Sequence, residues 1–289
     1  MTTKEWYTYT GSKRAGIMLA VPFEQKRMER WNPPYLVQPK LDGERCRAVI
    51  TDSNPILYTS EVNEFISVPH INMELKSYNL GDIELDGELY VHGMDFNDIQ
   101  SIVSRTTNLH PDFENIEYHI FDIVSDKLQL QRLLDLQSLK EYIGYSDNIK
   151  IVDCYLIDTF DELMQLYNQF RQLGYEGFII RNVDMPYVRK RLSNYMMKYK
   201  PKKRDIYPII SWKEEKDKYG SPKGRMGALV CTSDEGTVFS VGSGMTDEDR
   251  NYLWKIRDSL PGKRVLVSYQ HVFPKTNAPR FGTFLRIMP

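Results

Sequence analysis

The order of short strand-like runs and helical patterns constrains the fold of this 289-residue chain more than any other sequence feature. Alternating apolar and polar positions predict three strands between residues 40 and 124, over 56–59, 83–91 and 117–124. Helical patterns occur near 96–104 and 133–143. The regular strand–helix–strand rhythm of a parallel sheet is missing, so we expect an α+β domain with mostly antiparallel strands.

The clearest helix is predicted over residues 159–173. Thr159 and Glu162 form a capping box at its start, and apolar residues at helical spacing line one face. Gly174 suits the C-terminal end, because glycine adopts the positive φ angle that many helix C-caps require. A further strand is predicted directly afterwards, over 177–181.

A second domain is predicted after a change of composition at residues 202–205. Five short strands follow, over 206–212, 226–231, 237–241, 264–269 and 281–287. One helix, over 246–259, lies between the third and fourth strands, and Thr246 and Asp249 suit its N-terminus. This order is typical of an all-β OB-fold barrel. We therefore expect a boundary near residue 203, with one domain over 1–203 and an OB-fold domain over 204–289.

Composition excludes several classes of protein. The formal net charge of −1 argues against a wholly basic protein that coats DNA, although it allows local basic patches. No apolar run has the length of a membrane span, and the first residues lack the basic-then-apolar plan of a signal peptide. Three widely spaced cysteines form neither a disulfide framework nor a zinc spacing. We expect a cytoplasmic protein that does not bind membranes.

The stretch Lys40-Leu-Asp-Gly-Glu-Arg45 concentrates reactive side chains between two strand-like runs. A lysine between rigid strands is held in place while its amine stays available for chemistry. The alternative is a plain hairpin turn, since Asp-Gly is among the commonest turn dipeptides. This stretch alone does not separate the two interpretations.

Four further segments place charged residues at the edges of apolar runs. They begin at Asp86, Tyr118, Glu176 and Met196. Each has a structural alternative, as turn chemistry, core or a solvated strand face. Together they supply lysines for phosphates, carboxylates for a divalent metal or ribose hydroxyls, and an aromatic face for a base.

The ordered set of motifs resembles the covalent nucleotidyltransferase superfamily of ligases and capping enzymes. The motifs are Lys40-Leu-Asp-Gly-Glu-Arg45, Asp86-Gly-Glu88, Phe121-Asp122, Glu176-Gly177 and Lys198-Tyr-Lys200. Within that superfamily, the sequence is most similar to small viral and bacteriophage ATP-dependent DNA ligases. The resemblance covers nearly the whole chain, because the segments from Gly224, Phe239 and Pro279 resemble the OB domain of such ligases.

The resemblance implies a lysyl-AMP mechanism with ATP as cofactor. Lys40 would be the nucleophile that attacks the α-phosphate, and its pKa would be lowered by nearby cations and bound metal. Lys198 and Lys200 would act with it on the phosphates. Glu176 and Glu88 would be metal ligands for Mg²⁺, with Mn²⁺ as an alternative.

The same resemblance assigns the remaining nucleotide contacts. Glu88 would also bond the ribose hydroxyls, and Phe121 would stack on adenine with Gln38 near its exocyclic amine. Arg45 would position a nucleotide or DNA phosphate. Arg286, in the second domain, would approach the pyrophosphate during the first step. The motif around Arg286 lacks the usual Asp-Lys ending, so its role rests on fewer matching residues.

A basic run marks the expected surface for nicked duplex DNA. Residues 189–204 contain eight basic side chains and no acid. A solvated charge run is the alternative, but beside a nucleotide site the run favours a surface that follows phosphates. The expected DNA contacts are Arg45, Ser60, Arg191, Lys202 and Lys203. Ser60 is followed by Glu61, where many relatives have arginine, so the residue that meets the 5′-phosphate stays open.

The sequence thus predicts a monomeric enzyme that seals 5′-phosphate/3′-hydroxyl nicks through lysyl-AMP and DNA-adenylate intermediates. An RNA ligase or mRNA guanylyltransferase uses the same lysine chemistry and is the first alternative. A non-catalytic nucleic-acid-binding OB protein is the second. The intact set of Lys40, Glu88, Glu176, Lys198 and Lys200 favours an enzyme.

Overall fold

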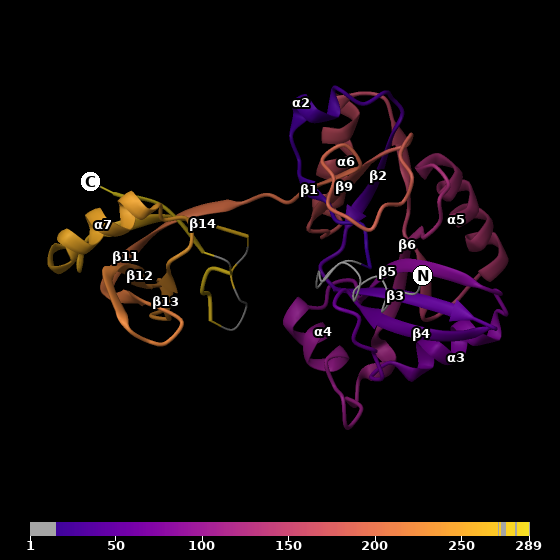
Figure 1. Cartoon of the computed structure of the whole chain (residues 1–289), viewed down its shortest axis with the longest axis horizontal. Coiled ribbons are helices and arrows are strands. Elements are labelled where there is room, and N and C mark those ends of the chain that lie inside the picture. The colour runs from indigo at the N-terminus through magenta and orange to yellow at the C-terminus, as the bar shows by residue number, and fades with distance from the viewer. Residues whose placement is uncertain (1–15, 271, 273–275, 281, 289) are drawn as a thin grey trace. The chain divides into compact units, whose positions relative to one another are not determined.

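The computed structural model describes residues 16–270, 272, 276–280 and 282–288. The chain divides into two compact units, Met1–Lys200 and Pro201–Pro289. Strands from distant parts of the sequence lie side by side within each unit (Figure 1). No helix of the described residues is long and apolar enough to cross a membrane.

The first unit contains two five-stranded sheets. The first sheet has the order β1-β10-β9-β2-β8. Its strands are β1 (Val21–Pro22), β2 (Tyr35–Lys40), β8 (Tyr155–Ile157), β9 (Gly177–Asn182) and β10 (Met196–Tyr199). Helix α6 (Phe160–Gln172) buries Leu163 and Phe170 in a core shared with β2 and β9, and the short helix α2 (Gln25–Met28) adds Met28 to it.

The second sheet of this unit has the order β4-β3-β5-β6-β7. Its strands are β3 (Glu44–Thr51), β4 (Asn54–Thr59), β5 (Ile83–Tyr90), β6 (Glu117–Ile123) and β7 (Ile149–Ile151). Helices α3 (Pro69–Ser77), α4 (Phe96–Val103) and α5 (Gln129–Ile143) contribute apolar residues to one core with this sheet. In the described part of the unit, only the β1–β10 and β6–β7 ladders are parallel, so the mostly antiparallel α+β prediction is confirmed.

Local capping signals placed the helix α6 correctly. Thr159 Oγ1 accepts a hydrogen bond from the Glu162 backbone at 3.3 Å, and the Glu162 carboxylate returns one to the Thr159 backbone. Gly174 has a φ of +89°, as expected for a residue that ends a helix. Helix α3 was not predicted. The strands β1, β7 and β8 were also not predicted, because two- and three-residue strands are too short to show a period.

The stretch after Lys40 is not a hairpin turn. β2 pairs with β8 and β9, whereas β3 pairs with β4 and β5. The residues Leu41-Asp42-Gly43 therefore carry the chain from one sheet to the other. The plain hairpin interpretation is wrong, and Lys40 lies at the point where the two sheets meet.

The second unit is one five-stranded sheet of order β13-β12-β11-β14-β15. Its strands are β11 (Lys203–Lys216), β12 (Pro222–Thr232), β13 (Val238–Val241), β14 (Arg264–Tyr269) and β15 (Thr283–Ile287). Helix α7 (Asp247–Lys255) and a 3₁₀ turn, Arg257–Ser259, lie between β13 and β14, as predicted. Phe281, the first residue of the expected last strand, lies outside the described residues.

The sheet of the second unit is open where a closed barrel was expected. Among the residues described, no ladder joins β13 to β15. One isolated parallel bridge, between Ser243 and Thr283, links their ends. The strand order and the helix position match the OB-fold prediction, whereas the expected closed barrel is not formed by the described strands.

Candidate active site

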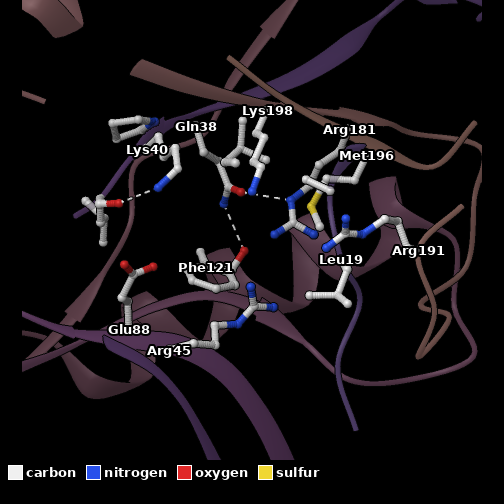
Figure 2. Close-up of a pocket in the computed structure, with 14 residues that line it drawn as sticks. Leu19, Gln38, Lys40, Arg45, Glu88, Phe121, Arg181, Arg191, Met196 and Lys198 are labelled. Carbon is white, nitrogen blue, oxygen red and sulfur yellow. Dashed lines mark hydrogen bonds between the residues drawn. The ribbon is translucent and has the colours of Figure 1, made fainter. Parts of the chain in front are cut away.

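A cavity of about 150 Å³ lies between the two sheets of the first unit (Figure 2). One wall comes from β2, β9 and β10, and the facing wall from β3, β5 and β6. The lining residues are Leu19, Ala20, Gln38, Pro39, Lys40, Leu41, Arg45, Glu88, Phe121, Ile179, Arg181, Arg191, Met196 and Lys198. The cavity therefore brings together most of the residues that the sequence predicted for nucleotide binding.

Lys40 ends β2 with its amine between two carboxylates. Its Nζ lies 2.5 Å from Glu176 Oε2 and donates to the Leu41 carbonyl at 2.9 Å. Burial lowers the pKa of Lys40, but the negative charges of Glu88 and Glu176 outweigh burial and raise it. The expected lowering of this pKa depends on a bound metal as well as on nearby cations, so it stays a prediction.

Glu176 connects Lys40 to Lys200. Its second oxygen, Oε1, accepts from Lys200 Nζ at 2.9 Å. Burial would raise the pKa of Glu176, but the positive charges of Lys40 and Lys200 overcome burial and lower it. The carboxylate thus stays ionised at neutral pH and aligns both lysines.

Gly177 makes this alignment possible. In the β2–β9 ladder, Gly177 of β9 pairs with Lys40 of β2. A Cβ on Gly177 would lie 2.0 Å from the carbonyl oxygen of Tyr199 in β10. Only glycine allows β10 to approach so closely at this point.

Glu88 faces Lys40 from the opposite sheet. Its Oε1 accepts a hydrogen bond from the Gly43 backbone N–H at 2.7 Å. A Cβ on Gly43 would lie 2.3 Å from the Leu89 carbonyl oxygen, so the Asp-Gly pair is needed for close packing of the linker against β5. Burial raises the pKa of Glu88, and the neighbouring charge of Lys40 partly opposes this shift.

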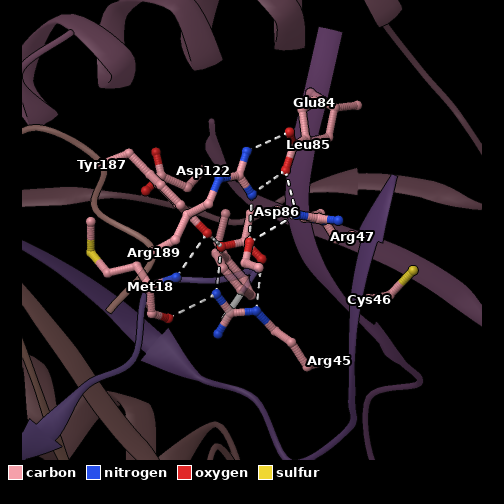
Figure 3. Close-up of polar contacts among 12 residues, drawn as sticks. Met18, Arg45, Cys46, Arg47, Glu84, Leu85, Asp86, Asp122, Tyr187 and Arg189 are labelled. Atoms are coloured by element: carbon pink, nitrogen blue, oxygen red, sulfur yellow. Dashed lines mark hydrogen bonds and ion pairs between the residues drawn. The ribbon is translucent and has the colours of Figure 1, made fainter. Parts of the chain in front are cut away.

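Phe121 and Arg45 form a stacked pair on the floor of the cavity. The guanidinium carbon of Arg45 lies 4.6 Å from the centroid of the Phe121 ring. Arg45 is also bound by two contacts to the buried carboxylate of Asp86, with Nε to Oδ1 at 2.7 Å (Figure 3). The Tyr187 hydroxyl donates to the same carboxylate at 2.6 Å. In this structure Arg45 therefore packs against the Phe121 ring, and the role of Arg45 in phosphate binding stays a prediction.

One member of the basic run has a structural role. Arg189 donates to both carboxylate oxygens of Glu84, at 2.7 and 2.6 Å, and also to the Gly16 carbonyl (Figure 3). Arg47 pairs with the same Glu84 at 2.8 Å. These contacts of Arg189 join β5 to the segment before β1, so its guanidinium is not available to bind a phosphate.

Two cations of the cavity have no acidic partner among the residues described here. Lys198 and Arg191 line its wall, and no ion pair joins either of them to a described carboxylate. Burial lowers the pKa of Lys198, and the positive charges of Lys40, Lys200 and Arg191 add to the effect. Two cations without acidic partners beside the Lys40 amine are suited to bind the phosphates of a ligand.

Several predicted residues lie outside the cavity. Ser60 is in the turn after β4 and does not line it. Lys202, Lys203 and Arg286 are exposed residues of the second unit. Their roles stay predictions.

Sequence reasoning gave no role to Arg181, which lines the cavity and lies 5.5 Å from the Phe121 ring centroid. Its position at the end of an apolar strand was visible, but its partners were not.

The donor set for a divalent cation consists of two carboxylates. No cluster of three or more metal-ligating side chains occurs in the described part of the chain. Mg²⁺ commonly keeps several waters and binds through one or two carboxylates together with substrate phosphates. Glu176 and Glu88, whose charges both act on Lys40, fit a metal that arrives with a nucleotide.

The fold and the cavity define a nucleotidyltransferase-type catalytic unit followed by an OB-like unit. The family described as ATP dependent DNA ligase domain matches residues 17–200, and the family described as DNA ligase OB-like domain matches residues 219–287. The chain belongs to the ATP-dependent DNA ligase family.

Curated relatives agree with this assignment. The DNA ligase of African swine fever virus is 30% identical over 268 residues, which cover 84% of this chain and 61% of the viral protein. The chain thus spans about three fifths of the length of that relative. The DNA ligase of Haemophilus influenzae is 27% identical over 207 residues, with 70% of each chain covered.

Solved structures show the same fold. A Lig E DNA ligase structure matches with a TM-score of 0.75 at 23% identity, and the match covers 94% of this chain and 98% of that one. The Chlorella virus DNA ligase-adenylate matches with a TM-score of 0.53 at 25% identity over the same shares.

Proposed function

We propose that this protein is an ATP-dependent ligase that seals nicks with a 5′-phosphate and a 3′-hydroxyl in duplex DNA. One observation carries the proposal: Lys40, which is ion-paired with Glu176, lines a cavity together with Glu88 and with two cations, Lys198 and Arg191, that have no acidic partner among the described residues. This arrangement brings together an amine that can attack phosphorus, carboxylates that can hold a divalent cation, and cations that can hold phosphates.

In the first step, Lys40 Nζ attacks the α-phosphorus of ATP. The new Nζ–P bond forms as the bond to the departing pyrophosphate breaks. The Lys40 ammonium gives two of its three protons to solvent or to the departing pyrophosphate and keeps one in the phosphoramidate. A divalent cation bound beside Glu176 and Glu88 supplies positive charge that offsets their effect on the Lys40 pKa. Lys198 and Lys200 stabilise the negative charge on the transferring phosphate.

The nucleoside is held by the rest of the cavity. Phe121 stacks on the adenine, Glu88 accepts hydrogen bonds from the ribose hydroxyls, and Gln38 lies near the exocyclic amine. We also propose that residues 1–203 act as the adenylation domain and 204–289 as the OB domain. Arg286 of the OB domain approaches the pyrophosphate in this step, which requires the domains to close and reopen.

In the second step AMP moves from Lys40 to a DNA 5′-phosphate, and in the third the adjacent 3′-hydroxyl displaces AMP. Arg45, Ser60, Arg191, Lys202 and Lys203 are the proposed DNA contacts of a monomeric enzyme. Positive side chains that neutralise phosphates release counterions, so binding should weaken steeply with salt.

The test is transfer of label from α-labelled ATP to the protein in the presence of Mg²⁺. We expect the wild type to become labelled and Lys40→Ala to stay unlabelled. Lys140→Ala is the matched control, because Lys140 is an exposed lysine paired only with the exposed Asp153. Absence of label in the wild type would sink the catalytic proposal.

The acceptor decides between this proposal and its relatives. We expect sealing of a nicked DNA duplex and no comparable joining of single-stranded RNA. Label from GTP in place of ATP would indicate a guanylyltransferase, and efficient joining of RNA would indicate an RNA ligase.

A further inference from the structure

The side-chain amide of Gln38 has three hydrogen-bond partners, of which Figure 2 shows Phe121 and Arg181. Its Nε2 donates to the Phe121 carbonyl oxygen at 2.8 Å and to the Cys154 sulfur at 3.1 Å. Its Oε1 accepts from Arg181 Nε at 2.9 Å. Gln38 is only 1% exposed, so bulk water does not compete for these contacts.

The partners determine which end of the amide faces which neighbour. A guanidinium can only donate and a carbonyl oxygen can only accept, so the amide oxygen faces Arg181 and the nitrogen faces Phe121. Both amide hydrogens have partners, whereas one lone pair of Oε1 is left over. Toward a ligand, Gln38 therefore presents an acceptor and no donor.

Arg181 cannot easily turn away from Gln38. Its Nη1 donates to Asp122 Oδ2 at 2.7 Å, and Arg132 Nε donates to Asp122 Oδ1 at 2.8 Å. All three of these charged side chains are almost completely buried. Rotation of Arg181 would leave a buried carboxylate with one of its two cations missing, which is strongly unfavourable.

We propose that Arg181 is a specificity-determining residue that selects the nucleobase by fixing the orientation of Gln38. A base that lies on the Phe121 ring brings its polar edge within reach of Gln38, because the same residue supplies the ring and the carbonyl that anchors the amide. The free acceptor matches the amino group of adenine. It opposes the carbonyl group that guanine or hypoxanthine carries at the same ring position. This inference rests on the proposed adenylation of Lys40.

The first test uses the unaltered protein and three nucleotides. Single-turnover modification of Lys40 is followed by intact-protein mass with ATP, with purine riboside triphosphate, which has no group at position 6, and with inosine triphosphate, which has a carbonyl there. We expect the modification rate to fall about tenfold or more from ATP to purine riboside triphosphate, because the hydrogen bond to Gln38 is lost. We expect a further fall of about tenfold or more to inosine triphosphate, because its carbonyl sets an unpaired acceptor against the Gln38 oxygen. Equal rates for the last two nucleotides would overturn the role of Gln38 as an acceptor.

The second test separates positioning from simple structural support. Arg181→Lys retains a positive charge for Asp122 but removes the Nε that holds Gln38 Oε1, so the position of the amide oxygen is no longer fixed. We expect the ATP-to-inosine-triphosphate rate ratio to fall about tenfold or more. A loss of structural support alone would slow both nucleotides equally and leave the ratio unchanged.

Arg105→Lys is the control variant for this second test. Arg105→Lys changes a surface arginine that bonds the Ser101 carbonyl, and it should leave the ratio unchanged. A folded Arg181→Lys variant with the wild-type ratio would refute the proposal. If that variant does not fold, the nucleotide series with the wild type decides. Absence of modification by ATP would instead refute the proposed function.

Discussion

Replacing Gly177 by alanine should damage catalysis more than stability. The added Cβ would lie 2.0 Å from the Tyr199 carbonyl oxygen, whereas ordinary van der Waals contact begins at 3.4 Å. The difference, 3.4 − 2.0 = 1.4 Å, is the separation that β9 and β10 must add at this point. The nearest atoms are all backbone atoms of Tyr199 and Lys200, so no side chain can move aside to relieve the clash.

The displacement acts directly on the proposed catalytic lysines. Gly177 pairs with Lys40 on one side, and β10 carries Lys198 on the other. A shift of about 1 Å at reacting groups can reduce a rate about 100-fold, so we expect at least that loss in lysine labelling from ATP. Overpacking of a buried site typically costs about 1–3 kcal/mol of unfolding free energy. That cost corresponds to a fall in Tm of roughly 2–12 °C for a unit of this size.

The assay combines single-turnover labelling with thermal unfolding of the same samples. Gly282→Ala is the matched control, because a Cβ there would find its nearest atoms at 3.4–3.8 Å. It should retain both Tm and labelling. A folded Gly177→Ala variant that labels within threefold of the wild type would refute the reasoning that this close approach sets the lysine geometry.

Three further predictions follow from the charges of the site. The pKa of Glu176 is lowered below its ordinary value of 4.5, so its ion pairs stabilise the fold above that pH and are lost as pH falls through the folded pKa. The Tm difference between wild type and Glu176→Gln should therefore be largest near neutral pH and shrink below pH 4.5; a constant difference would contradict it. Arg191→Ala should weaken nicked-DNA binding and reduce the slope of log K against log salt by about one, measured by fluorescence anisotropy. Chelation of divalent cations should abolish labelling and added Mg²⁺ should restore it, whereas full labelling in chelator would exclude the proposed metal role.

The sequence by itself determined the local features of this protein. The Thr159 and Thr246 capping boxes and the Gly174 helix end were predictable, because each depends on side-chain or backbone hydrogen bonds within a few residues. The motif residues Lys40 and Glu176 were predictable as a chemical inventory. The family resemblance added the order in which such residues occur.

The tertiary structure alone decided how those residues work together. Strand pairing places Lys40 beside Gly177, and it puts Lys40 at the junction of two sheets where a hairpin had been an equally simple interpretation. Arg181 and Gln38 are 143 residues apart in the chain, and their hydrogen bond depends on the register of β2 against β9. Likewise, the pKa of Lys40 is raised because the carboxylates of Glu88 and Glu176, which are remote from each other in the sequence, together outweigh the effect of burial. Such effects depend on distances between segments that are remote in sequence, and no local pattern of residues encodes those distances.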